Sequence, residues 1–290
     1  MPQIVQRCIA ALLGATLLVV AACTARTNSA MTLTRFAPDE YPSLLSQWNL
    51  LTHNNGELQR ATDTQIYSIN TPLFSDYTLK LRTISLPANT QANYSDFDVL
   101  DFPLGTVISK TFYYDTRDVP LSEAASARPA LFTDNKTLSR GTDTTRLLET
   151  RLLVHSTTGW QALPYVWNDD QSDAVLSLTG ALKTIGDNFY VVPSKDECAS
   201  CHALGRDKVL QPIGPKARHL HSAATDNPLD ALVTRGWLKP SATMQNLKNN
   251  AVWQTGASPA EYSDDELNHR ARSYLDANCG HCHNLSLIHI

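Results

Sequence analysis

The chain has no surplus of basic residues, and this narrows the functions open to it. Lysine and arginine number 24 against 28 aspartates and glutamates, which gives a formal net charge of −4 and an isoelectric point near 6.1. Nucleic-acid-binding domains carry a basic stripe or patch, so no nucleic acid is expected as a partner. The mild acidity suits a basic partner protein, although a charge of this size is first of all a solvated surface.

The apolar run near the N-terminus, residues 9–20, is too short to cross a bilayer as a mature helix. Its length is typical of the core of a signal peptide. Small residues then lead to Cys23, a pattern similar to the lipobox of bacterial lipoproteins, in which the cysteine is diacylated. We therefore expect a signal peptide at residues 1–22 and a lipidated tether at residues 23–40, with a cleaved soluble form as the alternative. Because Thr24 and not Asp follows the cysteine, sorting rules favour an outer-membrane anchor facing the periplasm.

No cysteine is left over for a disulfide. Of the six cysteines, Cys8 leaves with the signal peptide and Cys23 takes the lipid. The other four form two C-x-x-C-H motifs, at residues 198–202 and 279–283. An oxidising periplasm is therefore inferred from export and from the chemistry of these motifs, and not from bridges.

C-x-x-C-H is the attachment signal of c-type haem, and its recurrence predicts a di-haem protein. In each motif, two thiols on one side of a helical turn can add to the porphyrin vinyl groups, and the next residue can bind the iron as its proximal ligand. The predicted haem c residues are Cys198, Cys201, His202, Cys279, Cys282 and His283. A four-thiolate zinc site or a thioredoxin-like redox couple also uses C-x-x-C pairs. Neither explains why a histidine follows the second cysteine both times.

Residues 41–193 carry the pattern of a β domain. A short helix is expected around residues 42–51, and then come several short β-prone runs separated by turns. The clearest hairpin runs through residues 147–155 and returns through residues 160–167. One side of its first strand is predicted to carry Leu148, Thr150, Leu152 and Val154. This pattern predicts an antiparallel β sandwich or jelly roll.

From residue 194 onward the pattern is helical. Two capping boxes mark helix starts, Ser194 with Glu197 before the first motif and Ser263 with Glu266 before the second. We therefore predict a multidomain chain, β and then α, in which an all-α cytochrome c-like domain spans residues 194–278.

Residues 279–290 are expected to begin a second haem unit. Only residues 284–290 follow His283, whereas a haem pocket needs later sequence for its distal wall. We therefore expect the chain to be truncated after the second motif.

Two further residues are predicted to serve the first haem. The Gly-Pro pair ending at Pro215 resembles that of class I cytochromes, whose proline carbonyl accepts the Nδ1 proton of the proximal histidine and strengthens it as an iron ligand. Met244 is the only methionine after Met31 and is predicted to be the distal ligand. His219 and His221 are its rivals. An ordinary apolar filler is the alternative for Met244, and an open or otherwise ligated iron is a further alternative for the distal position.

Together with the export signal and the two motifs, four segments resemble a family of uncharacterised bacterial di-haem c-type cytochromes. They are residues 71–77 (TPLFSDY), 149–153 (ETRLL), 210–218 (LQPIGPKAR) and 272–279 (RSYLDANC). The resemblance implies electron transfer on the periplasmic side or at the outer membrane, with unsettled donors and acceptors. A di-haem peroxidase-type enzyme and a β-domain binding protein with accessory haem are the alternatives, and an electron carrier is favoured over a catalyst.

Overall fold

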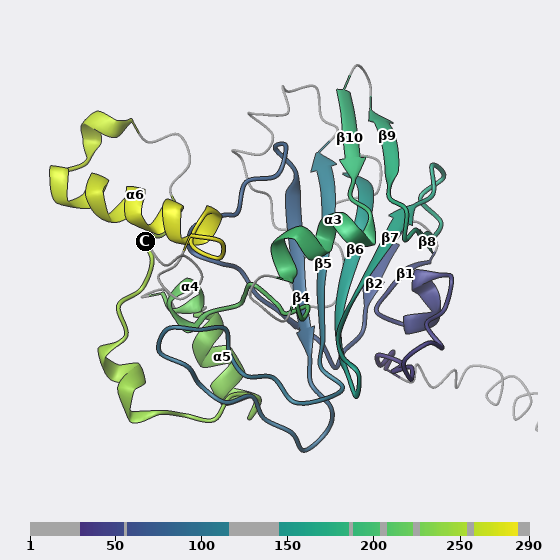
Figure 1. Ribbon diagram of the computed structural model, residues 1–290, viewed down its shortest axis with the longest axis horizontal. Helices are drawn as coiled ribbons and strands as arrows, with labels where there is room; N and C mark the ends of the chain where they lie inside the picture. Colours follow the sequence, from purple (N-terminus) through teal and green to yellow (C-terminus); the bar gives the residue numbers. More distant parts are fainter. Residues whose placement is uncertain are drawn as a thin grey trace, which may run out of the picture. The chain divides into compact units, whose positions relative to one another are not determined.

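The structure is a computed structural model and consists mainly of antiparallel β-sheet (Figure 1). It describes residues 30–54, 57–115, 145–185, 188–203, 208–222, 227–253 and 258–283. The predicted signal peptide, the lipidation residue Cys23 and the residues after His283 lie outside the described residues. Residues Thr32–Ile290 form one compact unit, apart from Met1–Met31.

Six strands form one sheet in chain order, and each is antiparallel to its neighbour. They are β3 (Gln65–Ile66), β4 (Leu79–Ser85), β5 (Val107–Asp115), β6 (Thr145–Ser156), β7 (Gly159–Trp167) and β8 (Ala174–Leu176). Two separate ribbons pair β1 (Leu51–Asn54) with β2 (Glu57–Arg60) and β9 (Ala181–Ile185) with β10 (Asn188–Val192). The predicted hairpin is confirmed as β6–β7.

A β-bulge in β6 changes which of its side chains share a face. The pairing of β6 with β5 skips Leu148, and one extra residue reverses the alternation along a strand. Leu147 therefore lies in a core cluster with Leu152 and Val154, whereas Leu148 packs in another cluster with Tyr190. The prediction that Leu148 shares a face with Leu152 and Val154 is wrong for this reason.

One face of the sheet is covered by the N-terminal segment. The helix expected around residues 42–51 is a single 3-10 turn, η1 (Leu45–Trp48), which leads directly into β1. Trp48 is fully buried, and its Nε1 donates to the Tyr165 hydroxyl at 2.8 Å. The aromatic residues of β7 on this face thus belong to the core.

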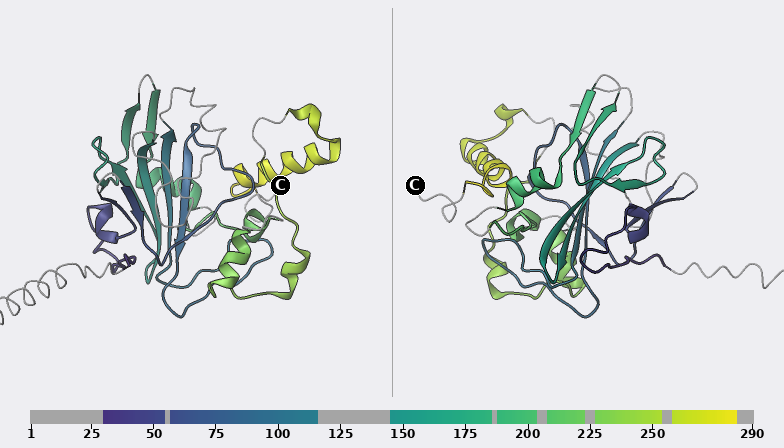
Figure 2. Two further views of the ribbon diagram at one scale, coloured as in Figure 1. Left: turned by 180° about the vertical axis from the view of Figure 1, so that it is seen from behind. Right: turned by 45° about the vertical axis from the view of Figure 1, so that its right-hand side comes forward.

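The opposite face is covered by the C-terminal part of the chain, as the right-hand view of Figure 2 shows. Its helices are α3 (Lys195–His202), α4 (Ala217–Leu220), α5 (Pro228–Thr234) and α6 (Asp264–Asn278), with 3-10 turns η3 (Ala242–Asn246) and η4 (Pro259–Glu261). Helices α4 and α5 pack on one end of this face, against Ile84 and Ile108. The ribbon of β9 and β10 packs on the other end, against Phe112 and Tyr114.

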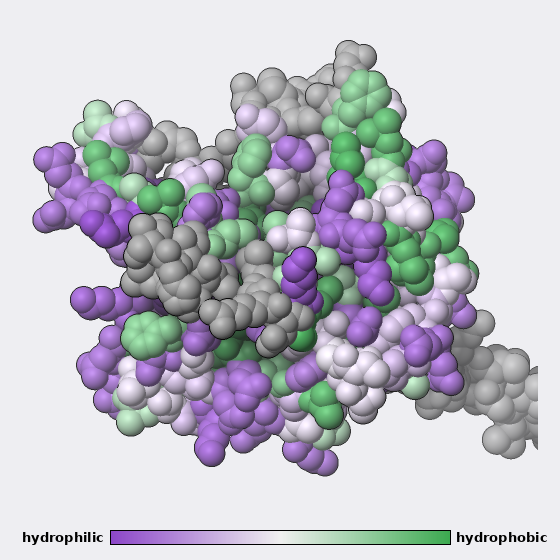
Figure 3. Space-filling view, in the orientation of Figure 1, coloured by the Kyte–Doolittle hydropathy of each residue, from purple (hydrophilic) through white to green (hydrophobic). Residues whose placement is uncertain are grey.

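The β9–β10 ribbon buries one side only. Tyr190 and Val192 are buried against the sheet, whereas Leu182, Phe189 and Val191 are each more than 60 % exposed. These exposed residues give the hydrophobic area over β9 and β10 in Figure 3. Helix α3 follows β10 directly, so the ribbon sets where the first C-x-x-C-H motif meets the sheet.

The predicted division into a β sandwich or jelly roll and a separate all-α cytochrome c-like domain is wrong. The helices after residue 194 share a core with the sheet, where Leu220 and Leu229 pack with Ile84 and Ile108. Helices α4 and α5 have only four and seven residues, too few to be stable without packing on something else. The 15-residue helix α6 buries only Ser273, so it cannot be the centre of a second core.

Candidate functional site

The first C-x-x-C-H motif lies on α3, whose start is fixed by the predicted capping box. The Ser194 hydroxyl accepts from the Glu197 backbone N–H at 3.2 Å, and the Glu197 carboxylate accepts from the Ser194 N–H at 2.8 Å. Cys198 and Cys201 lie three positions apart on this helix. Cys198 is buried and Cys201 is exposed. Residues at this spacing are neighbours on one helix surface, so both thiols are available to one ligand.

His202 ends α3, and its imidazole is held in one tautomer. Its Nδ1 lies 2.8 Å from the backbone carbonyl oxygen of Gln211. Because a carbonyl can only accept, Nδ1 carries the proton and Nε2 keeps its lone pair. Burial lowers the pKa of His202 from its ordinary 6.5 to about 4, so the ring is neutral at pH 7. A neutral imidazole with a free nitrogen is the form that binds metals.

The carbonyl predicted to orient His202, that of Pro215, has another partner. It accepts from the Leu100 N–H at 3.2 Å, while the Gln211 N–H donates back to the His202 carbonyl at 2.7 Å. His202 and Gln211 are therefore joined by two hydrogen bonds, and the role predicted for Pro215 belongs to Gln211. The Gly-Pro pair in the sequence does not show which carbonyl lies next to His202 Nδ1, that of Pro215 or that of Gln211, four positions earlier.

A cavity of about 460 Å³ lies between α3, the sheet and the end of α6. We call it the first cavity. Its volume falls within the range of about 300–1,000 Å³ usual for cofactor and ligand sites. Cys198, Cys201 and His202 all line it. The four segments that carry the family resemblance each contribute to its lining, through residues that include Leu73, Phe74, Arg151, Pro215 and Asn278.

The floor of the first cavity carries three cations, which sequence reasoning missed. Arg82 on β4 pairs in register with Lys110 on β5, and Lys110 pairs with Arg151 on β6. We call these three residues the cationic ladder. Glu149 is fully buried beside it and accepts from Arg151 Nε and Nη2 at 2.7 and 2.6 Å and from the Tyr190 hydroxyl at 2.6 Å. Burial, followed by repulsion from Arg82 and Arg151, lowers the pKa of Lys110 to about 7.

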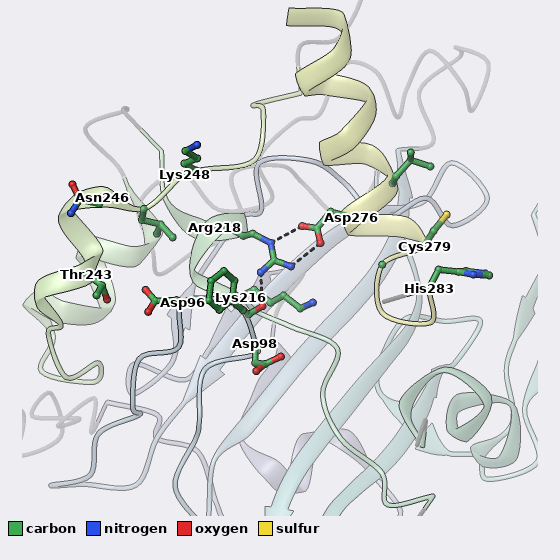
Figure 4. A pocket seen from close by; sticks show the side chains of 14 residues that line it. Asp96, Asp98, Lys216, Arg218, Thr243, Asn246, Lys248, Asp276, Cys279 and His283 are labelled. Carbon is green, nitrogen blue, oxygen red and sulfur yellow. Dashed lines mark hydrogen bonds and ion pairs between the residues drawn. The ribbon is translucent and has the colours of Figure 1, made fainter. Parts of the chain in front are cut away.

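The second motif follows α6 without a break. Its backbone turns on itself, with the Cys282 and His283 N–H groups donating to the Cys279 carbonyl at 3.0 and 2.8 Å. Cys279 and His283 line a second cavity of about 1200 Å³ (Figure 4). In this view Arg218 reaches across to Asp276, with Nε–Oδ2 and Nη2–Oδ1 distances of 2.8 and 2.7 Å.

The two motifs approach each other at the first cavity. His281, between the two cysteines of the second motif, lines that cavity, and its Nδ1 is buried without a hydrogen-bond partner in the described part of the chain. Burial, followed by the nearby Cys201, raises the pKa of the Cys282 thiol. Even so, no three His, Cys, Asp or Glu side chains of the described residues cluster as metal ligands. The four-thiolate zinc arrangement is thus not assembled.

The residues predicted to be distal iron ligands do not converge on His202. Met244 lies in η3, where its sulfur accepts from the Ser241 N–H at 3.4 Å, and it packs against the core under α4 and α5. It is not among the residues that line the first cavity. His219 does line it, but its Nε2 lies 2.8 Å from Asp276 Oδ2. His221 Nδ1 instead faces the Asn227 amide at 3.2 Å.

Comparisons with known proteins add no relative: no family model, curated protein or solved structure matches the chain. Among the described residues, none of the helices has the length and apolar character needed to cross a membrane. The interpretation of the site thus depends on its own geometry and on the sequence motifs.

Proposed function

We propose that this protein is a c-type cytochrome that transfers electrons through haem held covalently by Cys198 and Cys201, with His202 as the proximal iron ligand. One observation carries the proposal: both thiols and the imidazole of one motif line a single cavity of cofactor size. The hydrogen bond to Gln211 leaves His202 Nε2 as the nitrogen available to iron. When bound, haem supplies a one-electron couple between ferrous and ferric iron.

The second motif supports the same proposal more weakly. Cys279 and His283 line the second cavity, and Cys279, Cys282 and His283 would hold a second haem as the corresponding residues hold the first. The approach of the two motifs suits electron exchange between the two haems. We include in the proposal a lipid anchor at Cys23, a position facing the periplasm at the outer membrane, and a redox protein as the physiological partner.

The number of covalent haems tests the proposal. Protein matured in a host with c-type haem assembly is expected to show two haems by intact mass and pyridine haemochrome. The double variant Cys198→Ala/Cys201→Ala should lose one haem, and Cys279→Ala/Cys282→Ala should lose the other. Ser200→Ala changes a residue between the first two cysteines and is the matched control, because it keeps both thiols and the histidine.

Two results would contradict the proposal. Colourless exported protein with four free thiols would exclude haem attachment altogether. Rapid peroxide turnover with a reduced donor, by protein that carries both haems, would replace electron transfer with catalysis of the di-haem peroxidase type.

A further inference from the structure

The imidazole of His281 has a buried nitrogen without a partner. The residue stands between the two cysteines of the second motif, is half-buried and lines the first cavity. Its Nδ1 is shielded from water and forms no hydrogen bond in the described part of the chain. A buried polar atom left unsatisfied costs free energy, so the few that native proteins keep call for an explanation such as a redox role or a bound ion.

The acids that line the same cavity do not supply this partner. The Asp276 carboxylate accepts from Arg218 through both of its oxygens. The Glu197 carboxylate accepts from the backbone and hydroxyl at the start of α3. Lys110 and Lys216 line the cavity as well, and a charged ammonium can only donate. The partner of His281 is therefore expected to be a ligand of the cavity.

The turn that carries His281 is held in place by the end of α6. The N–H groups of Cys279 and Gly280 both donate to the Leu275 carbonyl at 2.8 Å. Gly280 lies so close to the helix that an added Cβ would meet the Asp276 carbonyl oxygen at 2.8 Å, nearer than Cβ atoms come to other atoms. The absence of a side chain lets the backbone fold back here, and the next residue, His281, reaches the first cavity.

The end of α6 is itself bound to the wall of the cavity. The Asn278 side chain accepts from the Phe74 N–H at 2.8 Å and donates to the Pro72 carbonyl at 3.1 Å. Phe74 and Asn278 both line the first cavity. The place of His281 is thus set by contacts of the helix that precedes it, and not only by its own short turn.

His281 also meets the need for a second axial ligand beside His202. Among the described residues, three histidines line the first cavity: His202, His219 and His281. The Nε2 of His219 is occupied by Asp276, at 2.8 Å from Oδ2. His281 follows α6, whereas His202 ends α3, so the two imidazoles come from different walls. They are close enough to interact, because repulsion from His281 is among the causes, after burial, that lower the pKa of His202.

We propose that His281 is the distal iron ligand of the haem attached to Cys198 and Cys201. This inference rests on the proposed function above. The second C-x-x-C-H motif would then serve both haems, the first through His281 and the second through its two cysteines and its own histidine. Methionine as the axial partner of histidine raises the reduction potential of haem iron. A haem bound by His202 and His281 is therefore expected to have a lower potential than one bound by His202 and Met244.

His281→Ala tests the proposal through the spin state of the iron. Electron paramagnetic resonance of the oxidised protein counts low-spin and high-spin haem, and intact mass confirms the haem content of each sample. The first haem is expected to be low-spin in the wild type. One haem per chain should become high-spin in His281→Ala, and added imidazole should restore the low-spin signal.

Two further variants make the assignment specific. His281→Met keeps a side chain that can bind iron, so its haem should stay low-spin while the reduction potential rises, a change that a merely structural role would not produce. In the background Cys279→Ala/Cys282→Ala, which is expected to carry only the first haem and keeps His281, the change of His281 to Ala should convert that single haem to high-spin.

His219→Gln is the matched control, because it removes the other imidazole that lines the first cavity and keeps a side chain that can donate to Asp276. Lys110→Met removes an amine from the same cavity and tests it as a rival ligand. The low-spin signal of the first haem should be retained in both.

The failures of the two proposals are distinguishable. A first haem that is high-spin in the wild type, or that stays low-spin with an unchanged potential in His281→Ala and His281→Met, would overturn the ligand and leave the cytochrome assignment standing. Equal loss of the low-spin signal in His281→Ala and in His219→Gln or Lys110→Met would overturn the ligand as well, since it would show a general disturbance of the cavity. Protein with no covalent haem would overturn both proposals.

Discussion

At the scale of single residues, Glu149 supplies the buried negative charge that pairs with Arg151 of the cationic ladder. The side chain has no exposed surface, and three donor atoms from Arg151 and Tyr190 satisfy its carboxylate. It forms an ion pair with Arg151, a member of the cationic ladder. Its charge therefore matters more than that of any surface carboxylate.

Glu149→Gln is expected to lower the free energy of unfolding by about 2 to 3 kcal/mol, because it leaves Arg151 without its counter-charge. The value lies at or below the lower limit of about 3 to 5 kcal/mol for a broken buried pair, since the Arg151 side chain is 30 % exposed. Urea unfolding of the two proteins at pH 7 measures the difference. Asp169→Asn is the control, because the Asp169 side chain is 86 % exposed and its pairs with Lys183 and Arg146 should matter little. Equal effects of the two changes would show that burial gives the Glu149 pair no special weight.

Single residues also show where sequence reasoning stopped. The alternation of Leu79 and Leu81 with charged neighbours correctly predicts strand β4. In a half-buried strand such alternation assigns the charged side to water, yet Arg82 is buried under the C-terminal part of the chain. The covering helix α3 comes more than 100 positions later, so no local pattern around Arg82 could reveal the ladder.

At the scale of the elements, α3 depends on its cap. It has eight residues and buries only Cys198, and isolated helices shorter than about 12–15 residues are marginal in water. The hydrogen bonds between Ser194 and Glu197 are thus a main source of its stability. Short-range rules of this kind are readable from sequence, and both predicted capping boxes, at α3 and at α6, are confirmed.

Ser194→Ala should lower the free energy of unfolding of the haem-free protein by about 1 kcal/mol, the usual effect of removing an N-cap. The midpoint of urea unfolding, with an unchanged slope, is the measurement. Ser200→Ala is the control in the same helix, because the Ser200 hydroxyl donates to the Glu197 carbonyl and caps no N–H group. A loss no greater than that of Ser200→Ala would contradict the role given to the cap.

At the scale of the whole molecule, Asp276 joins α6 to α4 and to the segment around Asn250 through hydrogen bonds. Its carboxylate accepts from Arg218 and His219 on α4 and from the Asn250 amide, at 2.7 to 2.9 Å. Burial by itself raises its pKa, but the hydrogen bonds from Arg218, His219 and Asn250 outweigh this and hold the pKa of Asp276 well below its usual range. The contribution to stability is therefore full above the unfolded-state pKa of about 3.9 and is lost as the pH falls below it.

Asp276→Asn should make the protein less stable at pH 7, and the difference from wild type should shrink as the pH falls from about 4 toward 2, because the wild-type contribution is lost below the unfolded-state pKa. Unfolding by urea at a series of pH values gives both curves. If the two curves of unfolding free energy against pH stay parallel over this range, another carboxylate is responsible for the loss of stability at low pH.

The fold as a whole was the least predictable level. Strands and the β6–β7 hairpin follow from local alternation and turn residues, and these predictions are confirmed. The division into a β domain and an α domain is wrong because the apolar residues of α4 and α5 look like the start of a new core. Only tertiary packing shows that they complete the core of a sheet begun at Ile84. The first cavity forms at this junction, from segments that lie from residue 67 to residue 281 in the chain.

The two hydrogen bonds between His202 and Gln211 affect when the imidazole takes its direction during folding. Closing a loop of so few residues costs little chain entropy compared with a long-range contact, so the direction of the imidazole is decided locally. The chain can thus present His202 Nε2 in its final direction before the distant strands have assembled beneath it. The ring needs no later reorientation, and preorganisation of this kind lowers the free-energy cost of capturing a cofactor.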